Sequence, residues 1–275
     1  MNIKEIDNMT YSELVALTRE RNRPSGGIRT INYVATYANI DKSKKILEIG
    51  CNTGFTSVNL ALLTGCKAVG IDINEESIRE AKRYASEQGV KKRTRFKVAD
   101  ALNLPFKDES FDIVWCSNVT SFLENKEKAI LEYLRVLKTR GTLVAIPIYY
   151  SKKPPISLVE KISKVIGTKI EIWDKDFWIN LFRSVSLKLN ISLELYYDRD
   201  FIYLDRKKRL KDYVNYLINK DHLRNFHKKE ILRKKLLEVF RLFNKNLQYC
   251  NFSILLFQKR KKQDEIELFL TKERW

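Results

Sequence analysis

The sequence predicts an α/β protein built on a doubly wound, seven-stranded, mostly parallel sheet. Two observations favour this class. Between residues 45 and 148, short apolar runs of strand length alternate with segments of helical periodicity. These runs are apolar at successive positions, which is typical of parallel strands covered by helices on both faces. The segments on either side have helical patterns, so a helical N-terminal cap and helical lid inserts are expected around the sheet.

The predicted elements follow one another in a regular order. Thr10 or Ser12 is expected to cap the first helix, and Asp174 or Asp176 the helix that begins near them. Strands are expected at residues 45–49, 68–72, 94–98, 111–116, 141–148, 191–204 and 248–258. Helices are expected at residues 3–22, 28–39, 53–63, 75–88, 126–137, 154–166 and 176–189, with two or three more in 205–246.

Three regions are expected along the chain. Residues 1–40 form the helical cap, and residues 41–150 form the ligand-binding core. Residues 151–275 complete the sheet with the strands near 191–204 and 248–258, which are expected to form an antiparallel edge pair. The same region carries the lid inserts, near 151–189 and 205–246.

The formal net charge is +18, and most of the excess lies in residues 205–245. This charge is compatible with attraction to nucleic acid, a membrane surface or an acidic substrate. It is equally compatible with a solvated helical face, which we favour because few aromatic residues are interleaved with the basic ones. Nucleic acid is therefore a possible partner but not the favoured one.

The apolar runs and the cysteine spacing predict where the protein is located and whether it binds a metal. The chain has no run of 18 apolar residues, so no membrane span is expected, and its charged start does not resemble a signal peptide. The four cysteines, Cys51, Cys66, Cys116 and Cys250, are far apart and form no C-x-x-C pair. Neither a zinc site nor a disulfide framework is predicted, and a reduced, cytoplasmic setting is expected.

The segment 46–57, Ile-Leu-Glu-Ile-Gly-Cys-Asn-Thr-Gly-Phe-Thr-Ser, carries the main functional signal. It reads as a buried strand, a tight turn and a helix start, where Gly50 and Gly54 let the backbone approach a ligand. Glu48 is an acid in an apolar strand, and a ligand ammonium is a natural partner for it. A dinucleotide fingerprint would need glycine at 52 and 55, where Asn52 and Phe55 stand, and no G-K-[ST] of a phosphate loop follows.

Three further loops are expected at the same edge of the sheet, because ligands of open α/β sheets bind beyond the carboxyl ends of the strands. Asp72 ends the second strand and can accept hydrogen bonds from ribose hydroxyls. Asp100 follows the third strand and can accept from an adenine amino group, while Ala101 leaves room for the ring. The loop after the fourth strand, with Asn118, faces the same site.

Together these four motifs, in residues 44–148, resemble the class I S-adenosylmethionine-dependent methyltransferases, and most closely their type 11, ubiquinone/menaquinone-biosynthesis-like group. The resemblance implies a Rossmann-like methyltransferase fold, S-adenosylmethionine as donor and S-adenosylhomocysteine as product. It departs from the family at Asn52, where glycine is usual, although asparagine tolerates a left-handed backbone. The resemblance implies Glu48, Gly50 and Gly54 around the methionine part, Asp72 on the ribose, Asp100 and Ala101 at the adenine, and Asn118 near the sulfonium. The other cofactor-binding residues expected are Cys51, Asn52, Phe55, Thr56 and Ile73.

The acceptor is expected to be a small molecule enclosed by the cap and the inserts. The sequence contains no diagnostic general base, and the candidates are Tyr11, Tyr149 and His222, although a surface position is the simpler reading of the histidine. No carboxylate cluster for a metal is seen. The candidates for acceptor binding are Tyr33, Tyr150, Trp173 and Trp178, the two tryptophans being equally compatible with plain core.

Two other functions remain open from the residues alone. A methyltransferase acting on nucleic acid or protein is suggested by the charge, although no Asn/Asp-Pro-Pro-Tyr/Phe motif for base amines follows the fourth strand. A protein that binds S-adenosylmethionine without transferring its methyl group is the third reading. The complete set of motifs and the lid inserts favour the small-molecule enzyme over both.

Overall fold

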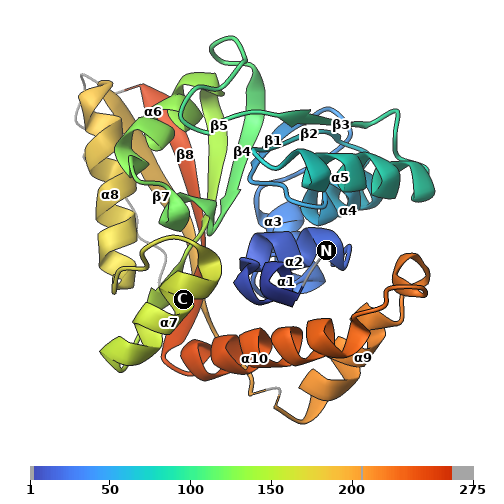
Figure 1. Ribbon diagram of the computed structural model, residues 1–275. Coiled ribbons are helices and arrows are strands. Elements are labelled where there is room, and N and C mark those ends of the chain that lie inside the picture. The colour runs from blue at the N-terminus through green and yellow to red at the C-terminus, as the bar shows by residue number, and fades with distance from the viewer. Residues whose placement is uncertain (1–2, 206, 262–275) are drawn as a thin grey trace.

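The computed structural model, which describes residues 3–205 and 207–261, is an α/β fold around one central sheet (Figure 1). The strands lie in the order β3-β2-β1-β4-β5-β8, and β6 and β7 also pair with β8. Strands β1 to β5 are mutually parallel, whereas β8 runs antiparallel to β5, β6 and β7. The predicted fold class is confirmed. The strands are β1 Lys45–Ile49, β2 Lys67–Asp72, β3 Thr94–Val98, β4 Phe111–Ser117, β5 Leu137–Ile146, β6 Ile148–Tyr150, β7 Ile191–Ile202 and β8 Cys250–Lys261.

The eighth strand arises from a break at Pro147. Strands β5 and β6 pair with β8 in one unbroken register, in which Ala145 faces Leu255 and Ile148 faces Phe252. Proline has no N–H to donate to the ladder, so the pairing is interrupted at this residue. The predicted strand 141–148 is thus β5 and β6 together, and the sheet keeps the predicted number of seven strand positions.

Helices cover both faces of the sheet. On one face, α6 (Lys126–Val136) and α8 (Lys175–Lys188) pack against residues such as Val114 and Cys116 of β4. On the other, α3 (Ile28–Tyr37) and α4 (Phe55–Thr64) pack against Ile113 and Trp115 of the same strand. Side chains alternate between the two cores, as they must in an extended strand. Helix α5 (Glu75–Glu87) extends this second layer over β3, against Phe96.

The N-terminal segment differs from the prediction, because the single helix expected at 3–22 is two short helices, α1 (Ile3–Asn8) and α2 (Tyr11–Leu17). Thr10 begins the second of them, and its backbone N–H donates to Glu13 Oε2 at 2.7 Å in a capping box. This cap satisfies amides that a continuous helix would bond internally, so the chain breaks there.

The two inserts complete the molecule. Helix α7 (Ile156–Ile166) precedes α8, whose N-terminus is capped by Asp174 as predicted. Between β7 and β8 lie η2 (Lys207–Arg209), α9 (Leu210–Ile218), η3 (Asp221–Leu223) and α10 (Lys229–Leu247). Helices α1, α2, α9 and α10 share a separate apolar core. Figure 1 shows α1 and α2 lying between the sheet layer and α10.

Candidate functional site

The turn between β1 and α4 is the centre of the candidate site, and we call residues 50–54 the cofactor turn. Gly50, Asn52 and Gly54 have φ of 67°, 43° and 80°. A Cβ on Gly50 would lie 2.7 Å from Val119 Cγ2, so that position admits only glycine. Asn52 adopts the left-handed backbone predicted for it, and its Oδ1 accepts a hydrogen bond from the Thr53 amide at 2.8 Å.

Glu48 is buried beneath this turn, and the chain itself supplies partners for it. Its Oε2 accepts from the backbone N–H of Ser57 at 2.9 Å and from Ser57 Oγ at 2.6 Å. Burial raises the pKa of Glu48 to about 7, while the hydrogen bonds from Ser57 and Thr56 act in the opposite direction. The predicted contact of Glu48 with a ligand ammonium stays a prediction.

Asp72, at the end of β2, ties that strand to the cofactor turn. Its Oδ2 accepts from the Asn52 amide at 2.9 Å and its Oδ1 from the Asn74 amide at 2.9 Å. Burial raises the pKa of Asp72 despite these bonds. The next side chain, Ile73, is 76% exposed and offers apolar surface beside the carboxylate.

The ends of β3 and β4 bring the remaining predicted cofactor residues to the same edge. Asp100 Oδ1 accepts from the Leu102 amide at 2.8 Å, and Ala101 is buried. Asn118 has a left-handed backbone with φ of 57°, and its Oδ1 accepts from Ser121 Oγ at 3.0 Å. Since β3, β2, β1 and β4 are adjacent and parallel, these loops and the cofactor turn share one edge of the sheet.

Asn118 and Trp178 line one small pocket next to this edge, between β4, β5 and α8. Trp178 is only 2% exposed, and within the described chain its Nε1 has no hydrogen-bond partner. Its indole packs edge-on against Trp173 and Phe177. The tryptophan therefore serves as core and as pocket wall at once. The full lining is Cys116, Asn118, Thr120, Ser121, Ala145, Ile146, Pro147, Trp178 and Phe182.

The other acceptor candidates are dispersed. Tyr33 packs against Phe201 of β7, with ring centroids 5.7 Å apart, and beneath the Arg199 guanidinium. Tyr150 donates its hydroxyl proton to Asn246 Oδ1 of α10 at 3.1 Å. Trp173 stacks on Phe177 with a centroid distance of 4.4 Å. These three side chains have partners within the fold, and their role toward an acceptor stays a prediction.

The three candidate catalytic residues lie on different elements. Tyr11, on α2, packs edge-on against Phe243 of α10, and burial raises its pKa well above the usual value. Tyr149, on β6, lies 3.4 Å from Ser253 Oγ, and burial raises its pKa too. His222 donates from Nε2 to the carbonyl of Leu17 at 3.0 Å. The structure does not bring these residues together.

Sequence reasoning missed several polar residues around the turn. Thr53 is fully buried, and its hydroxyl donates to the backbone carbonyl of Glu20 at 2.8 Å. Glu20 in turn accepts from the Tyr213 hydroxyl at 2.5 Å. Thr53 could have been singled out from its place between Asn52 and Gly54, whereas nothing in the sequence pairs Glu20 with Tyr213.

Three further observations concern the described part of the chain. Residues 3–205 and 207–261 contain no helix long and apolar enough to cross a membrane. The same residues contain no group of three or more His, Cys, Asp or Glu side chains arranged to hold a metal ion. All four cysteines are buried free thiols.

Comparison with known proteins gives a consistent result. Residues 40–185 match the model of a family described as a methyltransferase domain. The chain is 32% identical over 179 residues to an uncharacterized protein of Haemophilus influenzae, a match that covers 64% of this chain and 71% of that protein. It is 38% identical over 121 residues to norajmaline N-methyltransferase of Rauvolfia serpentina, covering 42% of this chain and 41% of the plant enzyme.

Solved structures extend the likeness to most of the chain. The crystal structure of MccD protein superposes with a TM-score of 0.70 at 24% identity, covering 87% of this chain and 100% of that one. At 24% identity this match shows a shared fold and nothing about function. The superposition covers more of the chain than the family model, which ends at residue 185.

Proposed function

The chain belongs to the class I S-adenosylmethionine-dependent methyltransferases, and from this we propose that it methylates a small organic molecule. One observation carries the assignment of the donor site. Four loops, containing the cofactor turn, Asp72, Asp100 and Asn118, meet at the carboxyl edge of one parallel sheet. We propose a separate role for each loop.

The residues present fit S-adenosylmethionine. Gly50 and Gly54 place no side chain at either end of the cofactor turn, and the N-terminal amides of α4 favour a carboxylate. The remaining acceptor capacity of Asp72 suits ribose hydroxyls, and the exposed Ile73 suits an adenine face. Bound S-adenosylmethionine would supply an electrophilic methyl group on a cationic sulfonium. The buried Glu48 and the half-buried Asp72 are acids beside this turn, and their ionised forms would stabilise such a cation.

The chain's own contribution to the reaction is then chiefly positioning. Methyl transfer needs the acceptor atom in line with the methyl carbon in a pocket that excludes water. Helices α1, α2, α9 and α10 share an apolar core beside the carboxyl edge, and Trp178 and Asn118 line a pocket there. An acceptor enclosed by these elements would be a compact molecule, and a plant relative is named for the N-methylation of norajmaline.

Two finer points are part of the same proposal. Membership of the ubiquinone/menaquinone-biosynthesis-like group rests on the resemblance of the four motifs in residues 44–148 to those of that group. A cytoplasmic location is supported by the four free cysteine thiols, which suit a reducing compartment.

Calorimetric titration with S-adenosylhomocysteine tests the donor site. The Asp72→Ala variant should bind the ligand roughly 10- to 100-fold more weakly, because it loses charge-assisted hydrogen bonds worth about 1.5–3 kcal/mol. Asp72→Asn should lose less, since its amide oxygen still accepts from the Asn52 amide. The control is Asp212→Ala, on the exposed first turn of α9.

Two outcomes would contradict the proposal in different ways. If Asp72→Ala binds as tightly as the parent, the assignment of the ribose site is wrong. If the parent protein itself does not bind S-adenosylhomocysteine, the donor is wrong. Release of S-adenosylhomocysteine from S-adenosylmethionine in the presence of small amines, phenols and carboxylic acids then identifies the acceptor class.

A further inference from the structure

Residues 18–23 connect α2 to the loop before α3 and lie across the cofactor turn; we call them the strap. Helix α2 ends in a Schellman motif, in which the Glu20 amide bonds the Val15 carbonyl and the Arg19 amide bonds the Ala16 carbonyl. Arg19 takes the left-handed position, with φ of 46°, that glycine usually fills. This ending leaves the carbonyls of Leu17, Thr18 and Arg19 without partners in the helix itself.

The insert between β7 and β8 supplies those partners. Lys220 Nζ donates to the carbonyls of Thr18 at 3.0 Å and Arg19 at 2.7 Å, and His222 Nε2 donates to that of Leu17 at 3.0 Å. Burial, and next the charge of Arg21, lower the pKa of Lys220 to about 8, so the amine stays charged at neutral pH. A cation at the C-terminal end of a helix is favourable.

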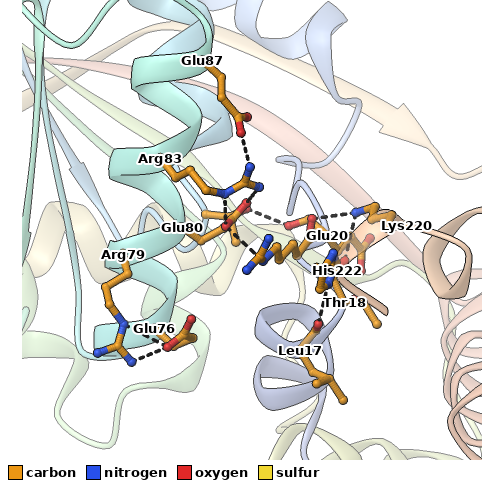
Figure 2. Close-up of polar contacts among 12 residues, drawn as sticks. Leu17, Thr18, Glu20, Glu76, Arg79, Glu80, Arg83, Glu87, Lys220 and His222 are labelled. Atoms are coloured by element: carbon orange, nitrogen blue, oxygen red, sulfur yellow. Dashed lines mark hydrogen bonds and ion pairs between the residues drawn. The ribbon is translucent and has the colours of Figure 1, made fainter. Parts of the chain in front are cut away.

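Two more contacts hold the strap from opposite sides. Glu20, 8% exposed, accepts from the Tyr213 hydroxyl of α9 at 2.5 Å. On the other side, Arg21 donates to Glu80 Oε1 of α5 at 2.6 Å, and Arg19 lies 3.6 Å from the same carboxylate. Figure 2 shows Lys220 and His222 on one side of the strap and Glu80 on the other.

The strap also touches the cofactor turn through one hydroxyl. Thr53 Oγ1 donates to the Glu20 carbonyl at 2.8 Å and accepts from the Asn22 amide at 3.3 Å. Thr53 follows Asn52, whose amide donates to Asp72 Oδ2. A continuous set of hydrogen bonds therefore runs from the insert through the strap to the residues proposed to bind the cofactor.

We propose that Lys220 and Tyr213 are positioning residues for the cofactor turn, so that the insert on the acceptor side sets the affinity for the donor. This rests on the proposed function, since it concerns the same donor site. Without these two side chains the strap keeps its ion pairs with Glu80 of α5 but loses the contacts that the insert makes to residues 18–20, so Thr53 and its turn sample more conformations. Part of the binding free energy must then order the turn, and the affinity falls.

Titration with S-adenosylhomocysteine tests the proposal with full-length variants. Lys220→Met and Tyr213→Phe should each raise the Kd by about fivefold or more, within the usual range of coupling between sites. Lys220→Arg keeps the charge and the donors and should restore most of the affinity. Lys211→Met is the matched control, because Lys211 is an exposed lysine on the same helix as Tyr213.

A double-mutant cycle separates positioning from general loosening of the fold. Thr53→Val cuts the hydrogen bonds between turn and strap while keeping the side-chain shape. In that background Lys220→Met should change the Kd by less than about twofold, because the path is already broken. If Lys220→Met does not fold, the same cycle can be measured with Tyr213→Phe in combination with Thr53→Val, because Tyr213→Phe removes only a single oxygen atom.

The outcomes are distinct from those for the donor site. Folded Lys220→Met and Tyr213→Phe variants that bind S-adenosylhomocysteine like the parent would overturn the positioning role while leaving the proposed function intact. Equal effects of Lys220→Met in the presence and absence of Thr53→Val would overturn it as well. A parent protein that does not bind the ligand would remove the proposed function, and this inference with it.

Discussion

At the scale of single residues, the buried Glu48 gives the protein a defined pH dependence. Its pKa is about 7 in the folded protein against an ordinary value of 4.5, so the folded state holds the proton more tightly between these pH values. As pH rises through this window the free energy of unfolding falls, by up to about 3 kcal/mol from this group. Glu48→Gln lacks this cost.

Urea unfolding of the parent and of Glu48→Gln between pH 5 and 8 tests this prediction. The stability of Glu48→Gln relative to the parent should increase with pH, with most of the change between pH 5 and 7. Contributions of groups that do not interact with Glu48 cancel in the difference. Glu160→Gln, at an exposed glutamate on α7, is the matched control. A difference between Glu48→Gln and the parent that does not change with pH would contradict the prediction.

The sequence predicted the unusual residues of the site better than their partners. Glu48 stands out as an acid in an apolar strand, and Gly50 and Gly54 as glycines where a turn must be tight. Ser57, which bonds Glu48, looks like any serine in the first turns of a helix. Tyr33 stays a candidate for acceptor binding, and its contact with Phe201 was not predictable, because an aromatic ring packs against many kinds of partner.

At the scale of elements, Gly54 joins the cofactor turn, α4 and α5. It caps α4 with φ of 80°, and a Cβ there would lie 2.9 Å from Ala81 Cβ and 3.0 Å from Phe96 Cζ. Gly54→Ala should therefore combine left-handed strain with overpacking and cost roughly 2–4 kcal/mol of unfolding free energy. Urea unfolding measures this cost.

Gly89→Ala provides the matched comparison, because Gly89 also has a positive φ, of 71°, but nothing lies within 4 Å of its added Cβ. Its variant should show only the conformational strain, about 1 kcal/mol. Equal losses in the two variants would show that α4, α5 and β3 have room to move apart at Gly54.

The boundaries of an element were predictable where a single local signal, such as an apolar run or a cap, sets them. The predictions were wrong where a capping residue or a proline interrupts a pattern that continues on both sides of it. The parallel strands follow from apolar runs, and Asp174 caps α8 as its position predicts. The single helix expected at 3–22 was wrong, because the capping box at Thr10 outweighs an apolar periodicity that continues through it. Pro147 similarly divides a strand whose register is otherwise continuous.

At the scale of the whole molecule, the assembly of the N-terminal helices with the distant insert was not predictable. Tyr11 and Phe243 are far apart in sequence, yet their ring centroids are 4.8 Å apart. The sequence of an amphipathic helix predicts which of its faces is buried, but it does not predict which element that face packs against. The basic residues of the insert show the same point, since Lys220 and Lys235 donate to backbone carbonyls of the N-terminal segment.

That engagement bears on the charge of +18 and on the alternative of a nucleic-acid substrate. Lys220 and Lys235 are engaged in the fold, and few aromatic residues are interleaved with the exposed basic ones. We therefore expect only weak, non-specific RNA binding, with a Kd above about 1 μM near 150 mM salt. Fluorescence anisotropy of a labelled structured RNA across a salt series measures it.

The competing outcome is equally sharp. Binding well below about 1 μM at this salt, with a steep loss of affinity as salt rises, would move the acceptor from small molecules to nucleic acid. If the exposed face of α10 made such contacts, Lys234→Glu would reduce the salt slope by roughly one. An unchanged slope would place the contacts elsewhere. Because the donor site lies at the sheet edge and the charge lies on the insert, this experiment tests the acceptor independently of S-adenosylhomocysteine binding.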